Sequence, residues 1–196
     1  MTRTRRLTMT AIAIGVAAIL TACTGGTDEG GGAQDPTSAA GAEAGGDEVE
    51  GSAKAAGLDP ENLPDPVHTV DVPATVDDDP DATMTVDFYG LTRDEKTVIA
   101  QFGFTVNSDA DVNKDLWTYL DGVAWSPHLI DTTNLTKHTV LTNVRERAQS
   151  AYQSVKFEPG ETYYAFAVFA APPNDVKTVA VNAVDGAPLI RDVVIQ

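Results

Sequence analysis

The fold is decided by residues 83–107, which read TMTVDFYGLTRDEKTVIAQFGFTVN. Apolar side chains occupy every other position over Met84–Phe88 and again over Val98–Val106, and most positions between them are polar. A period of two places alternate side chains on opposite faces of a β-strand, so two strands with one apolar face each are predicted. The charged run Arg93–Lys96 predicts the hairpin turn that joins them.

Further short segments of strand-forming residues lie on both sides of this hairpin, with turn residues between them. They are predicted over residues 68–72, 116–120, 128–131, 139–141, 162–169, 176–184 and 189–195. Residues 162–169 are apolar on both faces, which predicts a central strand of a sheet. Val144, Ala148, Ala151 and Val155 recur at spacings of four and three, which favours a short helix or an irregular crossover.

Short strands at intervals of about ten residues predict an all-β fold, an antiparallel immunoglobulin-like β-sandwich over residues 67–196. A closed barrel of similar size is the competing fold. All aromatic residues lie between Phe88 and Phe169, which locates the core in this region. The chain has a single cysteine, Cys23, so no intramolecular disulfide can form and a hydrophobic core must hold the domain.

Residues 1–22 have the three parts of a bacterial export signal. Three arginines come before residue 7, and an apolar run over Ala11–Leu20 follows. A helix of that length is about 15 Å long, roughly half the thickness of a bilayer's hydrocarbon core. The run is therefore too short for a permanent membrane span and has the length expected of a signal peptide. The pair Arg5-Arg6 is compatible with the twin-arginine export route. Residues 7–9 fit the twin-arginine motif poorly, which favours the general secretory route.

The sequence Leu20-Thr21-Ala22-Cys23 resembles the bacterial lipobox. The resemblance implies a diacylglycerol on the Cys23 thiol, with Cys23 as the mature N-terminus. Two acyl chains hold a protein at a membrane far more firmly than one. We therefore expect a lipoprotein that is anchored in the cell membrane through Cys23 and lies on the extracytoplasmic face of that membrane. An ordinary signal peptide followed by an incidental Cys23 is the alternative.

Residues 23–66 are predicted to form a disordered tether between the anchor and the domain. The stretch is rich in Gly, Ala, Asp and Glu, and such a composition buries too little apolar area to offset its ordering entropy. Residues 24–60 carry eight acids and one Lys, and residues 61–81 carry seven acids and no Lys or Arg. Nucleic acid is excluded as an expected partner, because no basic patch is present to displace its counterions.

One segment has side-chain oxygens at alternating positions, as the first half of a calcium loop does: Asp109, Asp111, Asn113 and Asp115. The complete pattern also needs a Gly at its sixth position and a Glu at its twelfth, where this chain has Lys114 and Leu120. We therefore expect an ordinary polar loop, no metal site and no cofactor, with these four residues as weak candidates.

Other catalytic patterns are missing from the sequence. His68, His128 and His138 are not spaced as paired metal ligands, and no Gly-x-Ser-x-Gly or Ser-x-x-Lys motif occurs. No catalytic residue is therefore assigned. Trp117, Tyr119 and Trp125 form an aromatic group that either stacks on a ligand or fills the core, and at least one tryptophan is expected in the core.

The C-terminal half resembles a known domain family. Pro159-Gly160-Glu161 precedes an aromatic-rich strand, and Ala170-Ala171-Pro172-Pro173 ends it. This is similar to the immunoglobulin-like β-sandwich domain of secreted and lipid-anchored actinobacterial proteins, over about residues 82–196. The resemblance implies the fold and supplies no catalytic residues.

These observations favour a non-enzymatic surface module that binds a protein or a cell-wall component through its loops or a sheet edge. A small-molecule or metal-binding lipoprotein that presents its ligand to a membrane partner is the alternative. A hydrolase with an unrecognised carboxylate or histidine site is the third hypothesis. A concave polar pocket favours the second, and a cleft with clustered titrating groups favours the third.

Overall fold

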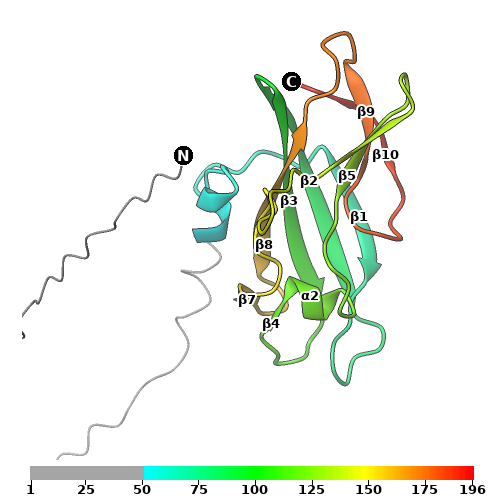
Figure 1. Ribbon diagram of the computed structural model, residues 1–196. Helices are drawn as coiled ribbons and strands as arrows, with labels where there is room; N and C mark the ends of the chain where they lie inside the picture. Colours follow the sequence, from blue (N-terminus) through cyan, green and yellow to red (C-terminus); the bar gives the residue numbers. More distant parts are fainter. Residues whose placement is uncertain (1–50) are drawn as a thin grey trace, which may run out of the picture. The chain divides into compact units, whose positions relative to one another are not determined.

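The computed structural model describes residues 51–196, which form two four-stranded antiparallel sheets packed face to face (Figure 1). The first sheet has the order β1 (His68–Pro73), β2 (Thr83–Asp94), β3 (Thr97–Asn107) and β8 (Thr162–Ala170). The second has the order β10 (Ile190–Val194), β9 (Thr178–Asn182), β5 (His128–Asp131) and β6 (Thr136–Thr139). The predicted β-sandwich is confirmed. The export signal, Cys23 and most of the tether lie outside the described residues.

Two smaller elements lie beside the sheets. The strands β4 (Lys114–Asp115) and β7 (Lys156–Phe157) pair with each other, and the one-turn helix α2 (Leu116–Tyr119) follows β4 directly. The segment 116–120 was predicted as a strand, and this is wrong. The Asp115 carboxylate accepts hydrogen bonds from the backbone N–H of Thr118 at 2.9 Å and from its hydroxyl at 2.6 Å. This N-cap favours a helical turn over an extended chain.

The hairpin of β2 and β3 has the predicted form. Its pairing runs in continuous register from Gly90 opposite Gln101 to Asp94 opposite Thr97, and a bulge near Phe88 interrupts it on the other side. At the turn, Glu95 adopts the left-handed conformation with φ of 50°. The apolar faces of both strands point inward, as the period of two requires.

The core lies between the two sheets and is rich in aromatic rings. Phe102 and Phe104 on β3 both pack edge-to-face with Trp125, with centroid distances of 5.5 and 5.4 Å and nearly perpendicular ring planes. Leu129 on β5 and Val181 on β9 close the core from the second sheet, and both are fully buried. Edge-to-face contacts of this kind add to the stability that burial gives.

Residues 141–150 cover the outer edge of β8. The Leu141 N–H donates to Val168 O at 2.9 Å, and the Val168 N–H donates to Ala148 O at 2.8 Å. The Ser150 N–H then donates to Phe166 O at 2.9 Å. This segment is the irregular crossover that the sequence left open, not a helix. The strand β8 is therefore last in its sheet rather than central as predicted, and the crossover and residues 51–58 bury it.

The chain end joins the two sheets on the other side. The Gln196 N–H donates to Leu91 O at 3.0 Å, and the Arg93 N–H donates to Gln196 O at 2.7 Å, so residue 196 pairs with the outer half of β2. The Ile195 N–H donates to Lys177 O beside β9 at 3.0 Å. These links cross between the sheets, but among the described strands β1 pairs with β2 alone. The sandwich is thus not the closed barrel of the competing prediction.

Residues 51–58 correct the predicted boundary between tether and domain. Residues 51–55 are helical, and Ala53, Ala56 and Leu58 are buried against Tyr164 on the outer face of the first sheet (Figure 1). The Gln101 side-chain amide donates to Ala56 O at 2.8 Å. Within the tether predicted over residues 23–66, residues 51–58 thus dock on the sheet, because Ala53, Ala56 and Leu58 bury apolar surface there.

Candidate functional site

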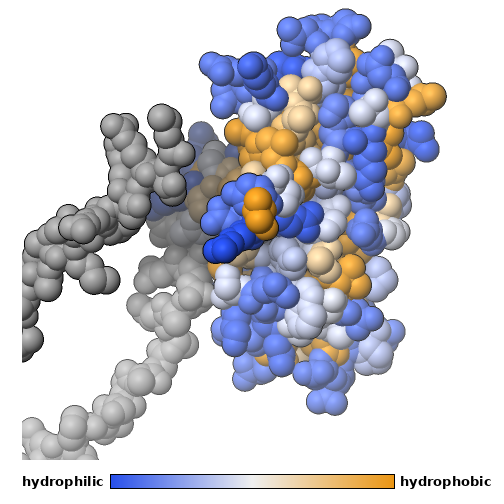
Figure 2. All heavy atoms as spheres, in the orientation of Figure 1, coloured by the Kyte–Doolittle hydropathy of each residue, from blue (hydrophilic) through white to orange (hydrophobic). Residues whose placement is uncertain are grey.

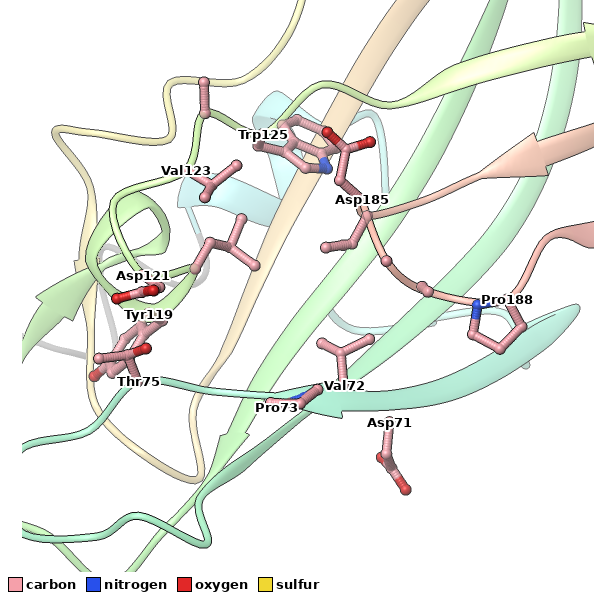
Figure 3. Close-up of a pocket in the computed structure, with 15 residues that line it drawn as sticks. Asp71, Val72, Pro73, Thr75, Tyr119, Asp121, Val123, Trp125, Asp185 and Pro188 are labelled. Carbon is pink, nitrogen blue, oxygen red and sulfur yellow. The ribbon is translucent and has the colours of Figure 1, made fainter.

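A cavity of about 520 Å³ opens at one end of the sandwich, beside the edge strand β1 (Figure 3). Three segments that are distant in the sequence form its walls. They are the end of β1 with residue 75, the chain from Tyr119 to Trp125 that follows α2, and residues 184–188 in the β9–β10 loop. A volume of this size falls within the usual range for small-ligand binding sites.

The lining of the cavity is mainly apolar. Val72 points into it from β1 in Figure 3, and the ring of Trp125 forms part of its wall. Trp125 is almost fully buried, and its indole N–H donates to Ala183 O at 2.9 Å. Phe102 and Phe104 also pack against this ring, and these contacts together hold it in position. The cavity therefore presents a preformed apolar surface to a ligand.

A tight turn after α2 shapes the mouth. Asp121 and Gly122 both have positive φ, 57° and 71°, which reverses the chain within two residues. A side chain at Gly122 would meet the Trp117 ring at 3.3 Å, so the position favours glycine for space as well as for conformation. The turn brings Val123, half of whose surface is exposed, to the rim of the cavity.

Three carboxylates border the cavity. Figure 3 shows Asp121 and Asp185 on different walls, while the Asp71 side chain points to the opposite side of β1 from Val72. The Asp71 carboxylate accepts a hydrogen bond from the Thr85 hydroxyl at 2.7 Å. Within residues 51–196, none of the three carboxylates forms an ion pair with a basic side chain. The site is thus apolar inside and negatively charged at its border.

The aromatic group predicted from the sequence is only partly brought together here. Tyr119 and Trp125 line the cavity, and both are core residues as well. The Tyr119 hydroxyl donates to Phe157 O at 2.9 Å, and burial raises the pKa of this phenol. Trp117, which is 38% exposed, lies over Gly122 and is not part of the lining.

The calcium-like loop has another explanation. Asp115 caps α2, and Asp109, Asp111 and Asn113 are exposed. In the part of the chain that the structure describes, no three His, Cys, Asp or Glu side chains are close enough to hold a metal ion.

The groups with shifted pKa values are scattered over the domain. Burial raises the pKa of Tyr163 to about 12, and burial lowers the pKa of His128. Hydrogen bonds, above all from the Asn134 side chain, lower the pKa of Asp131 in the β5–β6 hairpin. Of the described groups with a shifted pKa, only Tyr119 borders the cavity.

Sequence reasoning missed the wall residues Val72, Val184, Ala187 and Pro188. Each belongs to a segment that looked like an ordinary strand or turn, and only the pairing of the sheets brings these segments to one end of the sandwich. The acidic residues Asp121 and Asp185, each next to a glycine, were the one local signal available.

On the face seen in Figure 2, apolar residues form small separate patches among polar ones.

No helix within residues 51–196 has the length and apolar character needed to cross a membrane. Comparison of the chain with protein-family models, with curated proteins and with solved structures finds no match, so its function has to be inferred from its own residues.

Proposed function

We propose that this protein is a non-enzymatic binding module, anchored by a lipid on Cys23 at the extracytoplasmic face of the cell membrane, whose binding site is the cavity beside β1. The observation that carries the binding site is the preformed apolar cavity with Asp121 and Asp185 on its border. The anchor is supported by the lipobox-like sequence that ends at Cys23.

The chemistry of the cavity selects the class of ligand. An apolar group gains free energy by entering a cavity lined by Val72 and Trp125, at about 25 cal/mol for each Å² removed from water. A positive charge at the ligand's outer end lies near Asp121 and Asp185, which have no basic partner among the described residues. The preferred ligand therefore combines an apolar group with an amine or guanidinium.

The same cavity also supports the second function, a lipoprotein that presents a small molecule to a membrane partner. The supporting observation is its concave shape and its volume of about 520 Å³, which suits a whole small ligand as well as one side chain of a protein. Both functions use the same site, and the ligand's chemistry distinguishes them.

The binding site can be tested with n-hexylamine as a probe, observed by two-dimensional amide NMR. We expect chemical-shift changes at Val72, Val123 and Ala187, with a dissociation constant of about 1–10 mM for so small a ligand. Hexanoate should bind far more weakly, because its charge repels Asp121 and Asp185. Shift changes spread evenly over the domain, or none at saturating probe, would contradict the proposal.

A cavity-filling variant gives the matched control. Ala187→Trp places a large ring in the cavity and should abolish the shift changes caused by hexylamine. Ala170→Trp adds the same ring at an exposed position at the end of β8 and should leave them unchanged. Equal effects of the two variants would mean that the probe binds elsewhere.

The anchor needs a separate experiment in cells. The parent protein should incorporate labelled palmitate and sediment with membranes, and Cys23→Ser should do neither. If the Cys23→Ser protein sediments with membranes as the parent does, or if the parent takes up no label, the anchored part of the proposal fails while the cavity experiment remains valid.

A further inference from the structure

We propose that the natural ligand of this site is an extended peptide segment that pairs with the free edge of β1 and alternates apolar with basic side chains. This inference rests on the proposed binding function of the cavity and names its partner. It follows from the open edge, the direction of the backbone groups along it, and the side chains on its two faces.

The strand β1 offers the longest regular open edge in the sandwich. At the other end of the same sheet, the crossover covers β8, and the Tyr164 N–H donates to the Ser52 hydroxyl at 3.1 Å. In the second sheet, a bulge interrupts β10, where Asp192 has φ of 54°, and β6 is four residues long. The strand β1 pairs regularly with β2 over six residues, and no strand within residues 51–196 pairs with its other side.

The hydrogen bonds around β1 show which backbone groups face outward. The Ala74 N–H donates to Ala82 O at 3.0 Å, toward β2. Antiparallel ladders alternate in direction, so the N–H and C=O groups of Thr69 and Asp71 point away from β2. Beyond Pro73, which has no N–H, the Thr75 N–H donates to Tyr119 O at 2.9 Å and ends the open stretch. The edge of β1 thus offers an added strand the N–H and C=O groups of Thr69 and Asp71, at the spacing of a β-ladder.

The side chains of β1 set the pattern of such a strand. Val70 and Val72 face the core side, where Val72 borders the cavity. Thr69 and Asp71 face the other side, next to Asp87 on β2. Neighbouring strands align their side chains face by face. Alternate residues of the added strand therefore point toward the apolar cavity, and the residues between them lie beside Asp71.

The acidic face of β1 that carries Asp71 favours basic residues at the peptide positions that do not point toward the cavity. Asp71 and Asp87 each accept one hydrogen bond from a threonine of the adjacent strand, Thr85 and Thr69, and neither forms an ion pair with a described basic residue. The chain's own tether is a poor occupant, since residues 24–60 carry eight acids and one Lys. Like charges opposite each other on adjacent strands destabilise pairing. The fitting partner is a basic, apolar segment of another protein.

The test uses a short amidated peptide that alternates Lys and Val, added to the chain from residue 23 onward with Cys23→Ser. Calorimetry should show binding, and hydrogen exchange should slow at the amides of Thr69 and Asp71. A peptide of the same composition with its Lys and Val residues in two blocks, and an alternating Glu and Val peptide, should each bind at least about tenfold more weakly.

Two further changes separate strand pairing from simple charge attraction. N-methylation of the peptide amides on one edge should abolish binding, because it removes the donors of the ladder and keeps every charge. Asp71→Lys should weaken the Lys and Val peptide about tenfold. Asp109→Lys makes the same charge change at an exposed loop position and should change affinity less than twofold.

The outcomes distinguish this inference from the proposed function. If hexylamine binds in the cavity and the alternating peptide does not bind, the peptide inference is wrong and the binding site stands. If the peptide binds equally well after N-methylation, or with Asp71→Lys and Asp109→Lys alike, edge pairing is refuted. If neither probe binds, the proposed function itself fails.

Discussion

The two tryptophans differ in what each contributes to the molecule. Trp125 is 1% exposed, contacts two phenylalanine rings and donates a hydrogen bond to Ala183 O, whereas Trp117 is 38% exposed. We expect Trp125→Ala to lower the free energy of unfolding by about 3–5 kcal/mol. Trp117→Ala should cost about 1 kcal/mol or less. Urea unfolding measures both, and equal losses would contradict the assignment of Trp125 to the core.

Asp131 makes stability depend on pH in a defined direction. Its carboxylate accepts hydrogen bonds from the Asn134 side chain at 2.7 Å and from the N–H groups of Thr133 and Asn134, and these lower its pKa. A lowered pKa in the folded state stabilises the fold above the ordinary carboxyl pKa of about 3.9. That contribution is lost as the pH falls through the pKa of the folded state.

The pH dependence can be checked with two variants. Asp131→Asn should lower the free energy of unfolding at pH 7, and the difference from the parent should shrink in acid, as urea unfolding at several pH values would show. Asn134→Ala should raise the pKa of Asp131, measured by NMR titration of its carboxyl carbon. Asp109→Asn, at an exposed loop position, is the control. Its difference in free energy of unfolding from the parent should not shrink in acid.

At the scale of elements, residues 51–58 behave as part of the sandwich. Leu58 is 6% exposed and packs with Ala53 and Ala56 against Tyr164, whereas Leu63 nearby is 37% exposed. Leu58→Ala should therefore lower the free energy of unfolding by about 2 kcal/mol, at the lower end of buried leucine losses. Leu63→Ala is the matched control, with an expected loss of about 0.5 kcal/mol or less. A similar loss for both would mean that the segment does not stay docked.

The sequence predicted those elements in which local pattern and tertiary environment agree. The strands β2 and β3 follow a period of two over many residues, so their existence, turn and inward faces were predictable. The segment 116–120 is too short to show its period, and the Asp115 cap decided its conformation. In β8, apolar residues on both faces were a correct sign of burial, but the cover comes from residues 51–58 and 141–150 rather than from neighbouring strands.

The candidate site was less predictable than the fold for a physical reason. Its walls are the ends of elements, which carry no periodic signal, and they meet only through the pairing of β1 with β2 and of β9 with β5. Tyr119 and Trp125 were noticed for their rings, yet the rings serve the core first. The charged border was visible only as acids next to glycines, a pattern shared with ordinary turns.

At the scale of the whole molecule, the edges of the sheets show where the sandwich is closed and where it is open. Backbone hydrogen bonds from residues 141–150 close the side of β8, and bonds from residue 196 cover the outer half of β2. Open strand edges invite pairing with other chains, and natural proteins commonly protect them. Among the described strands, this leaves β1 as the longest regular open edge, and it lies beside the apolar cavity.

The extent of the folding unit gives a last prediction. The sequence places the start of the domain at residue 67, whereas the structure buries residues 53, 56 and 58 against the first sheet. A chain that begins at residue 67 should lose about 1–3 kcal/mol of unfolding free energy relative to one that begins at residue 51. The expected loss is the free energy gained by burying Ala53, Ala56 and Leu58, less the entropy cost of ordering the segment. Beginning at residue 24 instead of 51 should change nothing beyond about 0.5 kcal/mol, and urea unfolding of the three chains compares them directly. If the chains from residues 51 and 67 are equally stable, the domain starts at residue 67 and the docked segment contributes no net stability.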